Sequence, residues 1–154
     1  GGLDIFTTLY QQDNRWRLHV RGQHENSTYD PTNWDYYLES RGIKDVVTLY
    51  SQVEDMNQWF ENIDILLHPG QKEAFCYAVG EAMAKDIPVV CNEFYGVKDI
   101  WPDWILYQTH DDAIFNIIGI QEKIILNPSG RRFIEEEYSN DWMFTNFDEL
   151  IESL

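Results

Sequence analysis

The sequence predicts an α/β fold in which helices cover both faces of a parallel sheet. Short apolar runs alternate with amphipathic segments along all 154 residues. Strands that single helices separate in this way pair in parallel, and such a sheet is buried on both faces. The hydrophobic content of 44% and the length are those of one packed domain with an ordinary core. We therefore expect residues 1–154 to belong to one domain.

Five apolar runs predict the strands of this sheet. They are short and rich in Val, Ile, Leu or Tyr, which favour strands. The run Val46 to Tyr50, which follows the expected helix stop at Gly42, is an example of such a strand. The expected strands are residues 17–20, 46–50, 63–68, 88–92 and, with a weaker pattern, 104–107.

Helices are expected between the strands, because apolar residues there recur with the spacing of one helix face. Asp30 followed by Pro31 is a typical helix start, and Gly42 is a typical stop. The expected helices are residues 3–10, 31–41, a short one near 56–63, 75–85, 111–125, 130–138 and 141–154.

Two of these helices have expected N-caps. Asp111 or Asp112 is expected to cap the helix that runs to Ile125. The segment Asn127-Pro128-Ser129 is expected to end that helix and to cap the next one.

The composition limits the classes of partner. The chain has 11 Lys and Arg residues against 27 Asp and Glu residues, a formal net charge of −16. So acidic a chain is a poor partner for nucleic acid or anionic lipid. No apolar run approaches the ~20 residues of a membrane-spanning helix. Cys76 and Cys91 lack metal-ligand spacing, and we expect both to be reduced and buried in a cytoplasmic protein.

Residues 64–90 carry the strongest functional signal. An apolar run ends in a Pro-Gly turn, Glu73 follows, and an amphipathic segment places Glu81 eight positions further on. A second apolar run begins near Pro88. If residues 75–85 are helical, the two carboxylates are up to ~12 Å apart, about the span from a hexose to the ribose of a nucleotide sugar. The tip of a strand that leads into a helix is also where open α/β sheets bind anionic ligands.

This segment resembles the donor-binding signature of the GT-B glycosyltransferases, in particular the retaining family four, or glycosyl transferases group 1. That signature has two Glu residues with seven residues between them, in a Glu-Gly-Phe-Gly loop and a Glu-Ala-Met helix. The equivalents here are Glu73-Ala74-Phe75-Cys76 and Glu81-Ala82-Met83, followed by Pro88-Val89-Val90 and by Tyr95-Gly96-Val97-Lys98-Asp99. The resemblance implies a Rossmann-like donor-binding domain, the C-terminal half of a GT-B enzyme.

The resemblance also implies roles for individual residues. Glu73 would face the donor sugar as the catalytic residue, and Glu81 would accept hydrogen bonds from the ribose hydroxyls. The remaining donor-binding candidates are the amides of Ala74, Phe75 and Cys76 at the pyrophosphate, Val53 in the turn near the base, and Lys72 as a nearby cation. Each also has a plainer interpretation, as a solvated helix face, an ordinary helix start or a surface lysine. No Asp-x-Asp motif is present, and we expect neither a metal nor a cofactor.

The implied reaction is transfer of a hexose from a nucleoside diphosphate sugar to a saccharide or lipid-linked acceptor, as in polysaccharide biosynthesis. Two alternatives stay open, a nucleotide-sugar epimerase of the same fold and a non-catalytic scaffold domain of this type. We expect a cytoplasmic location, with any attachment to the inner face of a membrane made by another domain.

The chain opens with a predicted helix rather than a strand. In the family, a first strand and a basic turn that grips the pyrophosphate precede this helix. We therefore expect residues 1–154 to be a fragment of a two-domain protein, without that strand and without the N-terminal acceptor domain.

We predict that this chain by itself transfers no sugar. Helix amides stabilise each phosphate charge by only ~0.3–1 kcal/mol at an exposed site, and the net charge of −16 opposes the phosphates. Donor binding should be roughly millimolar or absent, and added salt should weaken it further. A radiolabelled transfer assay on this chain and on the full-length protein in parallel tests this. Robust transfer by the 154-residue chain would contradict it.

Overall fold

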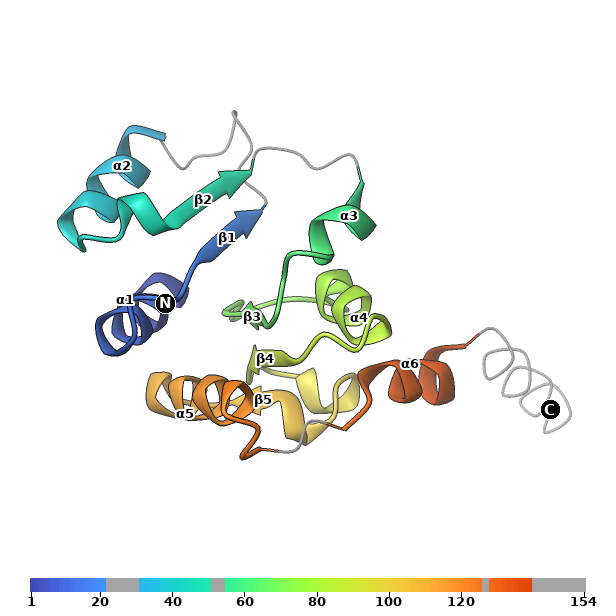
Figure 1. The fold of residues 1–154 in the computed structure, drawn as a ribbon. Coiled ribbons are helices and arrows are strands. Elements are labelled where there is room, and N and C mark those ends of the chain that lie inside the picture. The colour runs from blue at the N-terminus through green and yellow to red at the C-terminus, as the bar shows by residue number, and fades with distance from the viewer. Residues whose placement is uncertain (22–30, 51–54, 126–127, 140–154) are drawn as a thin grey trace, which may run out of the picture. The chain divides into compact units, whose positions relative to one another are not determined.

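The computed structural model describes residues 1–21, 31–50, 55–125 and 128–139. The chain forms two compact units, residues 1–63 and residues 64–154, and each is described by itself. Both units contain parallel strands flanked by helices (Figure 1). The α/β class with parallel pairing is confirmed.

The first unit is built on two parallel strands. Its elements in chain order are α1 (Gly2–Gln12), β1 (Leu18–Arg21), α2 (Pro31–Ser40), a 3-10 turn (Lys44–Val46), β2 (Val47–Tyr50) and α3 (Met56–Phe60). Strands β1 and β2 pair from Leu18 opposite Val47 to Arg21 opposite Tyr50. The buried side chains of Phe6, Leu38 and Ile43 form its core. Gly42 follows α2 with φ of +65°, as expected for a helix stop.

The second unit holds a three-stranded parallel sheet of order β3-β4-β5. Its elements are β3 (Leu66–His68), α4 (Tyr77–Ala84), β4 (Val89–Asn92), two 3-10 turns (Val97–Asp99 and Asp103–Ile105), β5 (Leu106–Tyr107), α5 (His110–Gln121) and α6 (Gly130–Tyr138). The central strand β4 is the most deeply buried, with Val89, Val90 and Cys91 all at most 2% exposed. Helices α4 and α5 both pack against β4.

Helix α4 is anchored by its apolar face. Val79, Ala82 and Met83 are buried, and they recur with the spacing of one helix face. Burying a side chain as large as that of Val79 or Met83 contributes about 1.5–3 kcal/mol to the stability of the fold. Since α4 directly follows the loop that holds Glu73, this packing also places the predicted site.

Helix α6 packs closely against α4. A Cβ on Gly130 would meet the Cα and the carbonyl oxygen of Met83, each at 2.9 Å. Ser129 caps α6, as expected, and its Oγ donates to Asp86 Oδ1 at 2.7 Å. The amide of Arg131 donates to the same oxygen at 3.0 Å. Asp86 thus connects the turn after α4 to the start of α6.

The five strands lie where the sequence places them, although each begins one to three residues later than expected. Among the described residues, β1 pairs with β2 in one sheet, and β4 pairs with both β3 and β5 in the other. The predicted helix at 141–154 lies outside the described residues.

The predicted cap of α5 was wrong. Thr109 is the N-cap, and its Oγ1 accepts from the amide of Asp112 at 3.1 Å. The Asp112 carboxylate accepts from the amide of Thr109 at 2.9 Å, which completes a capping box. Asp112 is therefore the third helical residue and not the cap. The helix also ends at Gln121 rather than Ile125, and Lys123 follows with φ of +57°.

Gly130→Ala should lower the free energy of unfolding by about 1–3 kcal/mol, because the new Cβ would collide with the α4 backbone and force the helices apart. Urea denaturation followed by tryptophan fluorescence measures this. Gly1→Ala is the matched control, since a Cβ there meets nothing within 4 Å. Equal midpoints for the two variants would show that the α4–α6 contact is looser than described.

Candidate functional site

Glu73 lies in the loop between the carboxyl end of β3 and the start of α4, as predicted. Its side chain is exposed. The loop turns tightly here: a Cβ on Gly70 would meet His68 Nε2 at 2.5 Å and Glu73 Cγ at 3.2 Å. His68 and Glu73 therefore both lie against Gly70, at the tip of β3.

His68 and Cys76 lie side by side at this tip. The Cys76 Sγ is 3.4 Å from His68 Nδ1 and 3.5 Å from Nε2. Burial lowers the pKa of His68, and the nearby Glu73 carboxylate opposes this. Burial also raises the pKa of the Cys76 thiol, while the amide of Val79 partly offsets the rise. At neutral pH both groups are therefore uncharged, so they are not an activated thiolate–imidazolium pair.

Cys91 lies on the neighbouring strand, in register with His68. It is 0% exposed. Burial raises the pKa of its thiol to about 12, with smaller contributions from Cys76 and Glu73. Cys76 and Cys91 are both free thiols. Cys91 is buried, as expected, whereas Cys76 is only half-buried.

The predicted start of α4 needs a correction. The sequence suggested that the amides of Ala74, Phe75 and Cys76 open the helix. Helix α4 instead begins at Tyr77, and Cys76 is its N-cap in the left-handed region, with φ of 57° and ψ of 75°. This conformation interrupts the helical backbone, so the three amides belong to the preceding loop.

Glu81 lies on the solvent side of α4. Tyr77 and Glu81 are both exposed and are four positions apart, so they share one helix face. Lys72 is exposed in the loop. In the described part of the chain, no ion pair joins Lys72, Glu73 or Glu81 to another side chain. Their charges remain available to a ligand.

Two long-range hydrogen bonds hold the loop, and the sequence analysis did not anticipate either. Asn92 Nδ2 donates to the carbonyl of Gly70 at 3.0 Å, and Trp101 Nε1 donates to the carbonyl of Phe75 at 3.1 Å. Trp101 comes 26 residues after Phe75. A tryptophan so far along the chain gives no local pattern that points to the loop.

The predicted base-binding turn, residues 51–54 including Val53, lies outside the described part of the chain. Tyr50, which ends β2 just before that turn, has its hydroxyl 2.8 Å from His19 Nδ1. Lys98, in the signature segment Tyr95-Gly96-Val97-Lys98-Asp99, forms an ion pair with Glu93 at 3.2 Å.

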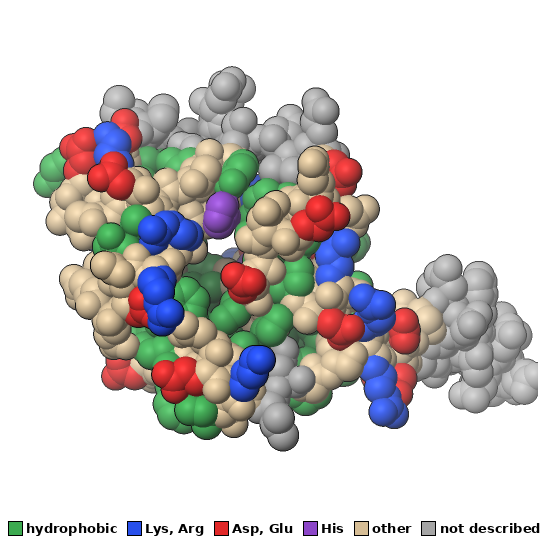
Figure 2. All heavy atoms as spheres, viewed as in Figure 1, with side chains coloured by type: hydrophobic (Ala, Val, Ile, Leu, Met, Phe, Trp, Pro, Cys, Tyr) green, Lys and Arg blue, Asp and Glu red, His purple; other side chains and the backbone are tan. Residues whose placement is uncertain are grey.

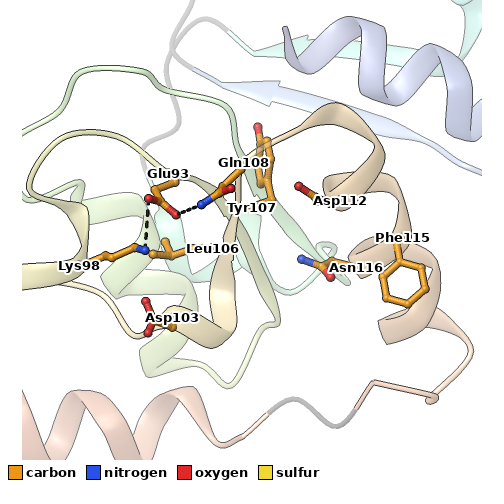
Figure 3. A pocket seen from close by; sticks show the side chains of 9 residues that line it. All are labelled: Glu93, Lys98, Asp103, Leu106, Tyr107, Gln108, Asp112, Phe115 and Asn116. Atoms are coloured by element: carbon orange, nitrogen blue, oxygen red, sulfur yellow. Dashed lines mark hydrogen bonds and ion pairs between the residues drawn. The ribbon is translucent and has the colours of Figure 1, made fainter.

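An open pocket of about 370 Å³ lies elsewhere in the second unit, at β5 and the first turns of α5 (Figure 3). Its lining residues are Glu93, Lys98, Asp103, Leu106, Tyr107, Gln108, Asp112, Phe115 and Asn116. None of the residues assigned to the donor site lines it. Several of its polar groups already have partners: Glu93 bonds to Gln108 at 3.0 Å and to Lys98 (Figure 3), and Asp112 belongs to the cap of α5. The pocket is therefore a weaker ligand candidate than the loop at Glu73.

Charges on the face drawn in Figure 2 are mixed: Lys and Arg side chains are scattered among Asp and Glu side chains. Among the described residues, no cluster of three or more His, Cys, Asp or Glu is arranged to hold a metal ion. Within the same residues, no helix is long and apolar enough to cross a membrane.

Iodoacetamide should modify Cys76 slowly and Cys91 more slowly still. Because burial raises both pKa values, the thiolate stays a minor form, and the Cys76 rate should rise about tenfold per pH unit between pH 7 and 9. Peptide mapping by mass spectrometry separates the two sites. A Cys76 rate that levels off below pH 8 would mean that its pKa is lowered instead, and would contradict the described burial.

Comparison with known proteins agrees with the α/β fold described above. The sequence model of the family described as glycosyl transferases group 1 matches residues 3–128. One curated relative, the GDP-mannose-dependent alpha-mannosyltransferase of Mycolicibacterium smegmatis, is 39% identical over 41 residues. That match covers 27% of this chain and only 11% of the relative. The family match covers most of the chain, which therefore belongs to the glycosyl transferases group 1 family.

Proposed function

We propose that this chain binds a nucleoside diphosphate hexose as the donor domain of a two-domain hexosyltransferase. Glycosyl transfer is the reaction of the family to which the chain belongs. The observation that carries the proposal is the placement of two exposed carboxylates. Glu73 lies in the loop beyond β3, and Glu81 lies on the exposed face of the helix that follows.

The two carboxylates suit the two ends of such a donor. A carboxylate accepts two hydrogen bonds in one plane, which matches a pair of neighbouring hydroxyls. Glu81 would accept from the ribose, and Glu73 would accept from the hexose. With seven residues between them, part loop and part helix, their separation is on the order of 12 Å, which suits a nucleotide sugar.

The pyrophosphate would lie between them, against the start of α4. Ala74 and Cys76 are small, so the donor can approach the loop backbone closely, and the thiol of Cys76 is directed toward His68. Loop amides, the positive end of the α4 dipole and Lys72 would supply positive potential. As the bond from the hexose to the diphosphate breaks, negative charge grows on the leaving group, and these groups would stabilise it. The proposed reaction needs no cofactor and no metal.

GDP-mannose is the first donor to test, because the curated relative is named for it. The acceptor we propose is a saccharide or lipid-linked saccharide, bound by a second domain.

Glu81→Ala should weaken donor binding by about 1–3 kcal/mol, or roughly 5- to 150-fold, because it leaves ribose hydroxyls without partners. Isothermal titration of the full-length protein with GDP-mannose and then UDP-hexoses measures this. Glu73→Gln should reduce transfer more than it reduces donor affinity, since Glu73 faces the hexose.

Glu135→Ala on α6 is the control, because Glu135 is also an exposed helical carboxylate. Donor affinity that is the same in Glu81→Ala and Glu135→Ala would remove Glu81 from the site. Donor binding without transfer would favour the epimerase or scaffold alternatives. Epimerised product would then identify the epimerase.

A further inference from the structure

The loop that carries Glu73 is tied down on both sides of that residue. The Gly70 carbonyl, three positions before Glu73, accepts from Asn92 Nδ2 at 3.0 Å. The Phe75 carbonyl, two positions after it, accepts from Trp101 Nε1 at 3.1 Å. Both donors come from outside the loop. Residues 71–74, between these two bonds, are all exposed. An exposed segment without such bonds would sample several conformations.

Trp101 is the stronger of these two ties. Its side chain is 1% exposed, and its ring centroid is 4.9 Å from that of Phe75 and 5.6 Å from that of Tyr138. The rings of Phe75 and Tyr138 are 5.2 Å apart and perpendicular, so the three rings form a closed cluster. The Tyr138 hydroxyl also donates to the carbonyl of Ile100, the residue before Trp101. The indole therefore has a fixed orientation.

The same indole also contacts α4. A Cβ on Gly80 would lie 3.3 Å from Trp101 Cη2, so the ring packs against the helix at the residue just before Glu81. One side chain thus touches both the loop that holds Glu73 and the helix that holds Glu81.

We propose that Trp101 is a positioning residue for sugar transfer, which holds the Glu73 loop at a fixed place relative to Glu81 through its bond to Phe75 and its packing on Gly80. The proposal rests on the proposed function, because it takes Glu73 to face the hexose. Misplacing a reacting group by ~1 Å can cost about 100-fold in rate, even when the altered residue does not touch the substrate.

Trp101→Phe tests the proposal, because it removes the N–H donor and keeps an aromatic ring. In the full-length protein we expect kcat to fall about tenfold. Donor KM should rise less than kcat falls, because the loop amides lose their fixed position while Glu81 remains on α4. Trp104→Phe is the matched control, since Trp104 lies nearby but is 36% exposed. If Trp101→Phe is poorly folded, benzothienylalanine at position 101 keeps the ring shape and removes only the N–H.

The thiol of Cys76 reports on the loop without any substrate, because it is adjacent to Phe75. Loosening the loop should accelerate modification of Cys76 about fivefold, since reactivity follows exposure. Cys91 should stay unreactive, because it lies in the central strand. The combination of a faster Cys76, a slow Cys91 and a lower kcat supports the proposal.

Three results would overturn the proposal: unchanged Cys76 reactivity, equal acceleration of Cys76 and Cys91, or a faster Cys76 with normal kcat. The second result would show general unfolding rather than a released loop. If the unaltered protein transfers no sugar from any donor, the proposed function fails. The thiol comparison would then still decide whether Trp101 holds the loop.

Discussion

The packing of α4 on the central strand β4 is the constraint on which the second unit depends. Val79, Ala82 and Met83 are buried on one face of α4, while Tyr77 and Glu81 remain exposed on the other. A helix held in this way has one solvent face, so the burial of its apolar face decides where Glu81 points. This packing also restricts the conformation of the loop before α4, because the loop must connect the tip of β3 to a fixed helix start. The side-chain bonds from Asn92 and Trp101 then fix that loop.

Electrostatics at this tip follow from burial more than from charge pairing. His68, Cys76 and Cys91 are kept uncharged by their surroundings, whereas Glu73 is exposed beside them. A chain with a net charge of −16 gives little long-range attraction to a phosphate. Any affinity for a nucleotide sugar must therefore come from short-range groups, namely the loop amides, Lys72 and the hydroxyl-binding carboxylates.

Sequence reasoning predicted the parts of this fold that repeat locally. The strand at Val89–Asn92 and the cap at Ser129 follow from apolar runs and turn chemistry. The start of α4 was misplaced because Cys76 adopts a left-handed backbone that is usual for glycine. The resembled signature has Gly at this position, but a cysteine by itself does not indicate such a backbone. The cap of α5 was misplaced because Thr109 and Asp112 together form the capping box. The N-cap preference of single residues favours Asp over Thr, and it therefore pointed to the aspartates. The role of Trp101 depends on a contact 26 residues away, which no local pattern encodes.

The most direct test of the central claim is an NMR titration of this chain with GDP and with GDP-mannose. Amide shifts can follow even roughly millimolar binding, because such ligands exchange rapidly. The account predicts saturable shifts confined mainly to residues 72–81, in the loop and on α4. Shifts concentrated instead around Glu93, Tyr107 and Gln108, at the pocket beside β5, would contradict the assignment of the donor site.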